Sequence, residues 1–416
     1  MSLSSVDDRQ IVVTGAGLWT PLADRCEASW SGIVSGARSA RWLDDSDGGF
    51  AETTPKGNPP LRWAGAPAAR RPGRNVAATM ALATVKESLA VARFDSTDFA
   101  RLRIGCVFGT SKGSFEILRD SQALSKAGLD GGENPESPTV WRSCLPSGPL
   151  EALMRAYPSI EQASCPVAAC ATGAMAILQG ARWIAEGRCD VVIAGSVDSA
   201  LQPALLASYR KLGVLARVEA DPATACRPFD RDRSGFIVGE GGGAVVLERL
   251  STARSRGAAP LAHWCGGINL CDSAGLLRGD GTGQTLAEAI GRLLKMTRTS
   301  PHEIDLVGLH GTGTIENDLA EGRGVRAALG ESLRPAAFSL KGAIGHLLGG
   351  AGSVETIAGL LALRDQVVPP TVNLASPDPD CLPDSVSAVS RRRSLKNFLK
   401  LSLGFGGHIV ALQFRR

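Results

Sequence analysis

The sequence predicts an α/β fold made of two similar halves, each a layer of strands and helices. Short apolar strand patterns alternate with helical patterns along nearly the whole chain, in its first part and again in its second. The length of 416 residues also exceeds what one hydrophobic core usually holds. We therefore expect an N-terminal half over residues 1–257 and a C-terminal half over residues 258–416.

The first half begins with apolar β-formers and then loses its periodicity over residues 36–75, which are rich in Gly, Pro, Asp and Arg. That composition predicts a long surface excursion. The other elements expected before residue 160 are a strand over residues 11–15, a helix over 77–92, a strand over 104–109 and helix-like pieces over 116–127 and 150–156.

The stretch around Cys170 is the most informative part of this half. A strand-like approach over residues 166–169 is expected to end at Cys170, and Thr172 and Gly173 open a helix that Gly187 ends before a strand over residues 190–195. Cys170 is then expected on a strand-to-helix turn, where the amides and dipole of a helix N-terminus favour thiolate over thiol. Small neighbouring residues leave room above the sulfur. Cys170 is thus a candidate nucleophile.

The second half repeats the alternation of strands and helices. In order, the pattern predicts a strand over residues 261–270, a helix over 286–294, a strand over 306–309, a helix over 319–329, a strand over 337–340, a helix over 353–363 and two final strands over 398–403 and 409–414.

Composition excludes several classes of function. The net charge of +4 and the lack of a basic cluster interleaved with aromatics give no reason to expect nucleic acid. A polar N-terminus and the absence of an apolar run of 18 residues give no reason to expect export or a membrane. The ten cysteines form no CxxC pair, so neither a metal site nor a disulfide framework is indicated, and we expect a reducing cytoplasm.

Three short motifs concentrate the polar chemistry of the second half. They are His310 in HGTGT, Lys341 and His346 in SLKGAIGHLLGGAG, and Phe405 in GFGG. Two of the five histidines thus directly follow predicted buried strands in loops of small residues, which favours a functional over a structural role.

Together these motifs resemble those of the β-ketoacyl-acyl-carrier-protein synthases of the thiolase superfamily, in the elongating type. The order is AACATG, HGTGT, SLKGAIGHLLGGAG and GFGG, and the resemblance extends from VVTGAGLWTPL near the N-terminus to the last of these motifs. It implies a thiolase-like five-layered αβαβα fold. It also implies a homodimer, or a heterodimer with a related ketosynthase, that acts on substrates carried on the phosphopantetheine of acyl carrier protein, with no bound cofactor and no metal.

The resemblance also implies residue roles. Cys170 would hold the acyl group, and the amides of Cys170 and Phe405 would form an oxyanion hole. His310 and His346 would hold the malonyl thioester during decarboxylation, with Lys341 tuning them. Substrate-binding positions would be Thr312, Thr314, Phe405 and Gly406, and supporting positions would be Asp318, Glu321 and Glu355.

Departures from the family pattern keep other functions in view. The family commonly reads NAHGT and NSFGFGGTN, whereas this chain has Gly308 before Leu309-His310 and has His408 in the last loop. His408 is expected at the surface, with a substrate contact as the alternative. A decarboxylating ketosynthase is the first hypothesis. A chain-length-factor-like partner subunit and a non-decarboxylating acyltransferase are the alternatives.

Overall fold

The computed structural model describes residues 10–47, 50, 62–69, 75–117, 142, 144–276, 279–333, 335–382 and 385–416. Ten strands within these ranges form one sheet in the order β10-β9-β13-β14-β8-β1-β7-β6-β4-β5. Their bounds are β1 Ile11–Trp19, β4 Ile104–Gly109, β5 Ile160–Ser164, β6 Val191–Asp198, β7 Gly241–Arg249, β8 Ala262–Cys271, β9 Leu306–Gly308, β10 Ala336–Phe338, β13 Asn397–Gly404 and β14 His408–Arg415.

The two halves contribute five strands each, in matching order. From the centre outward, β1-β7-β6-β4-β5 in the first half corresponds to β8-β14-β13-β9-β10 in the second. In both sets the first three strands pair antiparallel and the last three pair parallel. The sets join where β1 pairs with β8 over three residues. The fold is therefore α/β with two similar halves, as the sequence predicts.

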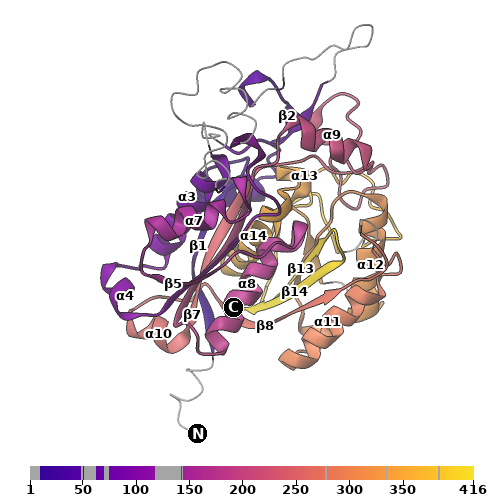
Figure 1. Ribbon diagram of the computed structural model, residues 1–416. Helices are drawn as coiled ribbons and strands as arrows, with labels where there is room; N and C mark the ends of the chain where they lie inside the picture. The colour runs from indigo at the N-terminus through magenta and orange to yellow at the C-terminus, as the bar shows by residue number, and fades with distance from the viewer. Residues whose placement is uncertain are drawn as a thin grey trace, which may run out of the picture.

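The helices complete five layers (Figure 1). The apolar cluster between the two strand sets contains residues of α8 (Thr172–Ala185) and α14 (Ala351–Asp365) together with residues from both sets. A second cluster packs α3 (Val76–Val91) and α7 (Gly148–Ala156) on the outer face of the first set. A third packs α11 (Gln284–Thr297) and α12 (Ile315–Leu329) on the outer face of the second. The expected αβαβα layering is confirmed.

The helices α8 and α14 meet at glycines. A Cβ on Gly173 would lie 2.3 Å from the amide nitrogen of Ser353, and a Cβ on Gly352 would lie 2.5 Å from that of Ala174. Both distances are shorter than any real contact, so only glycine permits this approach. The first turns of the two central helices are thereby held together, and these are the turns that follow Cys170 and His346.

The remaining elements are short or connect the layers. They are α2 Cys26–Val34, β2 Arg41–Trp42, β3 Ala64–Gly65, α4 Ser96–Arg101, α9 Pro203–Lys211, α10 Leu250–Ser255, α13 Lys341–Ile344, β11 Val367–Val368 and β12 Arg391–Arg392, with 3-10 turns that include η2 Ala169–Ala171 and η5 Leu348–Gly350. Among the helices that the structure describes, none is long and apolar enough to cross a membrane.

One sequence prediction about the approach to Cys170 is wrong. The strand lies at β5, whereas residues 166–168 lie outside the sheet and Ala169 already belongs to the 3-10 turn that holds Cys170. Pro166 lacks an amide hydrogen for a strand ladder, and Ala169 has a left-handed φ of 45°, so neither continues a strand. The predicted helix over residues 116–127 lies almost wholly outside the described residues, as does part of the 36–75 excursion.

Candidate active site

The turn that carries Cys170 is fixed by its neighbours. Cys170 lies in η2 directly before α8, and its side chain is buried. The Thr172 hydroxyl accepts a hydrogen bond from the Ala168 amide at 2.9 Å and donates one to the Ala169 carbonyl at 2.7 Å. These bonds hold Ala169 in its left-handed conformation, a strain of the kind found at functional sites. The sulfur is thus aimed by a rigid backbone.

His346 contacts this sulfur from the other half of the chain. Its Nε2 lies 3.1 Å from Cys170 Sγ, while its Nδ1 accepts a hydrogen bond from the Leu348 amide at 3.3 Å. An acceptor at Nδ1 places the proton of the neutral ring on Nε2. Phe236 packs edge-on against the ring, with centroids 5.0 Å apart. The ring is therefore oriented to donate toward the sulfur.

His310 stands next to His346. The centroids of the two rings are 5.4 Å apart at an interplanar angle of 80°. Burial lowers the pKa of both histidines well below their ordinary value, and the charge of Lys341 lowers the pKa of each further. Both rings are therefore neutral near pH 7, as hydrogen-bond donors rather than acids.

Two buried carboxyl groups shape the loop after β9. Glu321 accepts hydrogen bonds from the amides of His310 at 2.5 Å and Gly311 at 2.7 Å. Asp318 accepts from the amides of Thr312 at 3.0 Å and Gly313 at 3.2 Å, and from that of Phe229 at 2.8 Å. Burial raises the pKa of Asp318 and raises that of Glu321 to about 7. Both groups act on the backbone and leave the His310 ring free to face the site.

Lys341 lies behind His310 at the start of α13. Its Nζ donates to the carbonyl oxygen of His310 and, at 2.6 Å, to Oε1 of Glu355 on α14. Both side chains are buried. A second buried lysine, Lys400 on β13, lies 2.9 Å from Oε2 of the same carboxylate. One carboxylate therefore serves two lysines.

The protonation state of Cys170 differs from the sequence-based expectation. Burial raises the pKa of the thiol to about 11, although the charges of Lys112 and Lys341 act in the opposite direction. The resting side chain is thus a thiol at neutral pH, and the thiolate expected from the helix terminus is a minor species. Burial within the central layer outweighs the favourable charges.

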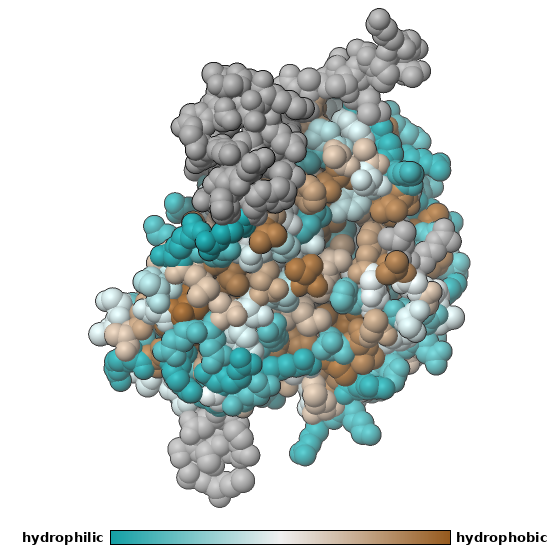
Figure 2. Space-filling view, viewed as in Figure 1, coloured by the Kyte–Doolittle hydropathy of each residue, from teal (hydrophilic) through white to brown (hydrophobic). Residues whose placement is uncertain are grey.

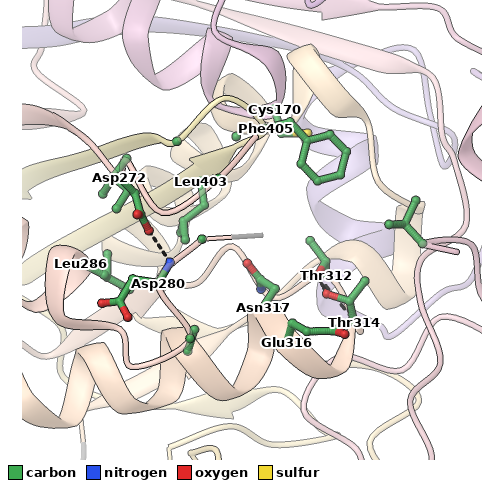
Figure 3. A pocket seen from close by; sticks show the side chains of 18 of the residues that line it. Cys170, Asp272, Asp280, Leu286, Thr312, Thr314, Glu316, Asn317, Leu403 and Phe405 are labelled. Carbon is green, nitrogen blue, oxygen red and sulfur yellow. Dashed lines mark hydrogen bonds between the residues drawn. The ribbon is translucent and has the colours of Figure 1, made fainter. Parts of the chain in front are cut away.

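A cavity of about 670 Å³ leads to the sulfur. Figure 3 shows Cys170 and Phe405 together at one end, with Thr312, Thr314 and Asn317 along one side. The hydroxyls of Thr312 and Thr314 lie 2.9 Å apart. A volume of this size is typical of a ligand pocket.

The loop between β13 and β14 closes one side of the cavity. A Cβ on Gly404 would lie 3.3 Å from the Cys170 amide nitrogen, so the loop runs directly beside the nucleophile turn. Gly406 donates its amide hydrogen to the Leu276 carbonyl at 2.7 Å, and the Asp272 amide donates to the Gly407 carbonyl at 2.8 Å. His408 lines the cavity and is half-buried, so it does not lie on the open surface expected for it.

Two charged side chains next to this site, Lys112 and Lys400, were not predicted from the sequence. Lys112 forms an ion pair of 3.2 Å with the buried Asp198, which also accepts from the Gly349 amide at 2.8 Å. Lys400 is fully buried although it stands in a strand. A lysine between leucines in FLKLSL was the available signal, because a strand with both faces covered has no exposed position for it. Within the described ranges, no cluster of His, Cys, Asp and Glu could hold a metal ion.

Comparison with known proteins gives a consistent result. Residues 8–253 match the family model for the β-ketoacyl synthase N-terminal domain, and residues 267–375 match that for its C-terminal domain. The chain is 34% identical over 414 residues to 3-oxoacyl-[acyl-carrier-protein] synthase 2 of Mycobacterium tuberculosis, covering 98% of this chain and 97% of the relative. It is 31% identical over 419 residues to the oxytetracycline polyketide putative β-ketoacyl synthase 1 of Streptomyces rimosus, at 98% and 97% coverage.

Two solved structures share the whole fold. One is described as a type II polyketide synthase acyl-carrier protein in complex with its ketosynthase bound to the hexaketide. It matches with a TM-score of 0.88 and 26% identity, covering 98% of this chain and 99% of that one. The other, the ishigamide ketosynthase/chain length factor, matches with a TM-score of 0.83 and 25% identity at the same coverage.

Proposed function

The chain belongs to the β-ketoacyl synthase family and is a condensing enzyme of fatty-acid or polyketide synthesis, and from that premise we propose that Cys170, His310, His346 and Lys341 carry the reaction. The observation that carries the proposal is the 3.1 Å contact between Cys170 Sγ and His346 Nε2. It joins a nucleophile to a proton donor at the end of a cavity.

In the first step, the Cys170 thiol attacks the acyl thioester of an acyl carrier protein. The bond from sulfur to the acyl carbon forms, the bond to the pantetheine sulfur breaks, and the thiol proton ends on the released pantetheine thiol. The backbone amides of Cys170 and Phe405 hold the oxyanion of the tetrahedral intermediate, at about 3 kcal/mol for each donor. The closeness of Gly404 to the Cys170 amide supports that pairing.

In the second step, malonyl-acyl-carrier protein replaces the first carrier. The neutral rings of His310 and His346 donate hydrogen bonds to the thioester carbonyl, which stabilise the enolate formed as carbon dioxide leaves. The enolate carbon forms a bond to the acyl carbon on Cys170, the bond from that carbon to sulfur breaks, and the released thiolate takes a proton from solvent. The product is a 3-oxoacyl group on the carrier. Lys341 acts through the His310 carbonyl and tunes the pair electrostatically.

The cavity supports a phosphopantetheine arm as the route for both substrates. Thr312 and Thr314 offer hydroxyls to its amides, and Phe405 and Gly406 border the thioester end. Asp318, Glu321 and Glu355 support the histidine loop and Lys341 without touching substrate. The residues described in this site call for no bound cofactor in this scheme.

We propose a dimer, formed with a second copy or a related ketosynthase. Among the described strands, β5 ends the sheet and pairs with β4 alone, which leaves its other edge as a place where a partner could bind. Figure 2 shows apolar side chains gathered over the middle of the face between β5 and β13. Leu145 and Val167, which flank β5 along the chain, are each 50% exposed. Sedimentation of the purified chain tests this, with a mass of two chains as the expected result.

We also propose a cytoplasmic location, since all ten cysteines are free. We further propose two structural units that divide at residue 257.

The test of the reaction measures both half-reactions of the purified protein. Mass spectrometry follows acylation of Cys170 by acyl-carrier proteins of several chain lengths, and carbon dioxide release follows decarboxylation of malonyl-acyl-carrier protein. We expect acylation at Cys170 alone and decarboxylation that depends on His310 and His346. A folded chain that does neither, alone and with a candidate partner, would establish a chain-length-factor-like subunit instead. Acylation without decarboxylation would establish the non-decarboxylating acyltransferase.

A further inference from the structure

Lys400 is a buried charged side chain that the reaction scheme does not use. It lies in the middle of β13, on the same face as Phe398, which packs in the central apolar cluster with residues of α14. Its side chain is fully buried. Gly308 on the neighbouring strand β9 leaves space for it, since a Cβ there would lie 3.2 Å from Lys400 Cδ. The absence of a side chain at Gly308 therefore makes room for the lysine in the interior.

The contacts of Lys400 fit an ammonium group and not a neutral amine. Its Nζ lies 2.9 Å from Glu355 Oε2, donates to the Gly308 carbonyl at 3.4 Å and donates to the Leu401 carbonyl. Two backbone carbonyls accept its hydrogen bonds and the carboxylate oxygen forms an ion pair with it, a set of partners that suits the charge and the N–H groups of an ammonium. A neutral amine has only two N–H groups and a lone pair without a donor here. The charged form is therefore the one that these partners satisfy. Burial lowers the pKa of Lys400 below its ordinary value, and the charge of Glu355 acts against that shift.

Glu355 links this ammonium to the histidines. Its Oε2 faces Lys400 and its Oε1 accepts from Lys341, whose Nζ also donates to the His310 carbonyl. Because each carboxylate oxygen has its own lysine, the carboxylate cannot rotate toward one partner without leaving the other. The chain of contacts runs from β13 through α14 to the loop after β9.

We propose that Lys400 is a positioning residue for decarboxylation: a fixed internal cation that locks Glu355 and, through Lys341, holds His310 in place. The proposal rests on the proposed function of the histidine pair. Cys170 lies outside this chain of contacts, so Lys400 acts on the second half-reaction and leaves the first almost unchanged.

The charge of Lys400 has a second consequence. The groups around the two rings are the cations Lys341, Lys400 and Lys112, the carboxyl groups Glu355, Glu321, Asp318 and Asp198, and the Cys170 thiol. The charge of Lys400 lowers the pKa of His310 and of His346. Removing it raises both pKa values, so protonation, which takes the Nδ1 of His346 from Leu348, begins at a higher pH.

The test compares Lys400→Met with Lys396→Met, an exposed lysine just before the same strand. For Lys400→Met we expect carbon dioxide release to fall by about tenfold or more, from loss of histidine alignment. Acylation of Cys170 should stay within about threefold, because the partners of Lys400 are Glu355 and two backbone carbonyls and not Cys170 or His346. The acid limb of the decarboxylation profile should move to higher pH. Lys396→Met should match the wild type in all three.

A second pair of variants separates charge from folding. Lys400→Arg keeps the cation and Lys400→Gln keeps a hydrogen-bond donor without charge, and thermal unfolding checks that both fold. We expect Lys400→Arg to retain most decarboxylation and the wild-type acid limb, and Lys400→Gln to lose both. Equal behaviour of the two variants overturns the proposal. So does parallel loss of both half-reactions.

The same experiment distinguishes the two levels of inference. An active wild type with an unaffected Lys400→Met overturns the role of Lys400 alone. A wild type that performs neither half-reaction overturns the proposed function and this role with it. Titration of the histidine ring carbons by NMR adds a readout that needs no turnover: two of the five pKa values should rise in Lys400→Met and stay unchanged in Lys396→Met.

Discussion

Each half contributes the turn before its central helix to the site, but the two turns carry different side chains. In the first half Cys170 precedes the central helix α8, and in the second His346 precedes the central helix α14. The strands beside them correspond as well, with Ser196 of β6 paired to Gly109 and Lys400 of β13 paired to Gly308. Ser196 meets a neutral hydroxyl of α14, that of Ser353, at 2.8 Å, whereas Lys400 meets the charge of Glu355.

This contrast shows which features of two similar halves can give them different chemical roles. Backbone layout and helix position are shared, so they do not decide which half supplies the nucleophile. The side chains differ: the second half holds buried lysines and carboxyl groups around His310, whereas the first half presents a thiol on a turn of small residues with the Lys112–Asp198 ion pair nearby. Four sets of substitutions or measurements test this division, and their expected effects decrease in the order given.

Removing the nucleophile should abolish the reaction that depends on the first half, acylation, and leave decarboxylation in place. Cys170→Ala is expected to lower condensation on the order of 10³-fold or more, because no other group accepts the acyl chain. Decarboxylation should persist, since the histidines remain. Cys265→Ala, on β8, is the matched control and should leave the rate unchanged. Mass spectrometry for acylation and carbon dioxide release measure the two outcomes, and acylation elsewhere in Cys170→Ala would contradict the assignment.

Neutralising the charged contact should cost far more stability than removing the neutral one. Glu355→Gln leaves two buried lysines without an anion and should lower the free energy of unfolding by about 3 kcal/mol. Ser353→Ala removes a neutral hydroxyl that bonds to Ser196 and to the Gly350 carbonyl, and it should cost about 1 kcal/mol. Urea unfolding at fixed protein concentration measures both. Equal losses would mean that the two halves are stabilised in the same way.

Substitutions of the two histidines should differ in their effect on acylation, because His346 contacts the Cys170 sulfur and His310 does not. His346→Ala should lower decarboxylation by about 10²-fold and also slow acylation of Cys170, since it removes the donor to Sγ. His310→Ala should lower decarboxylation and leave acylation close to wild type. His263→Ala, on β8, serves as the control. If both variants slowed acylation equally, the contact between His346 and Cys170 would have no functional meaning.

The smallest effect concerns the reactivity of the thiol. Since burial raises the pKa of Cys170 to about 11, its thiolate fraction should grow about tenfold for each pH unit between 7 and 9. Its alkylation by iodoacetamide should rise accordingly. Lys112 opposes burial through its charge, so Lys112→Met should raise the pKa further and slow alkylation roughly three- to tenfold. Peptide mass spectrometry at several pH values measures this, and a rate independent of pH would contradict the raised pKa.

The sequence was informative wherever chemistry and local pattern coincide. Cys170, His310 and His346 stand in small-residue loops at element ends, and the structure brings them together; their catalytic roles stay a prediction. The approach to Cys170 was assigned to the wrong segment, because the alternating exposure of β5, an edge strand, gives a weak apolar signal. Lys400 stands between two leucines, which indicates its burial but not its role. Its three partners come from β9, β13 and α14, and only folding brings them to one point.

The close contact of α8 and α14 at their glycines also limits which hybrid proteins can be made from halves of different relatives. Gly173 belongs to the half with the nucleophile and Gly352 to the half with the histidines, and each lies against the backbone of the other helix. A hybrid that joins the first half of one relative to the second half of another must therefore keep both glycines. A single methyl group at either position would push the two helices apart and so displace Cys170 and His346, which precede them, from each other. Halves of different relatives can replace one another only if the contact at Gly173 and Gly352 is kept.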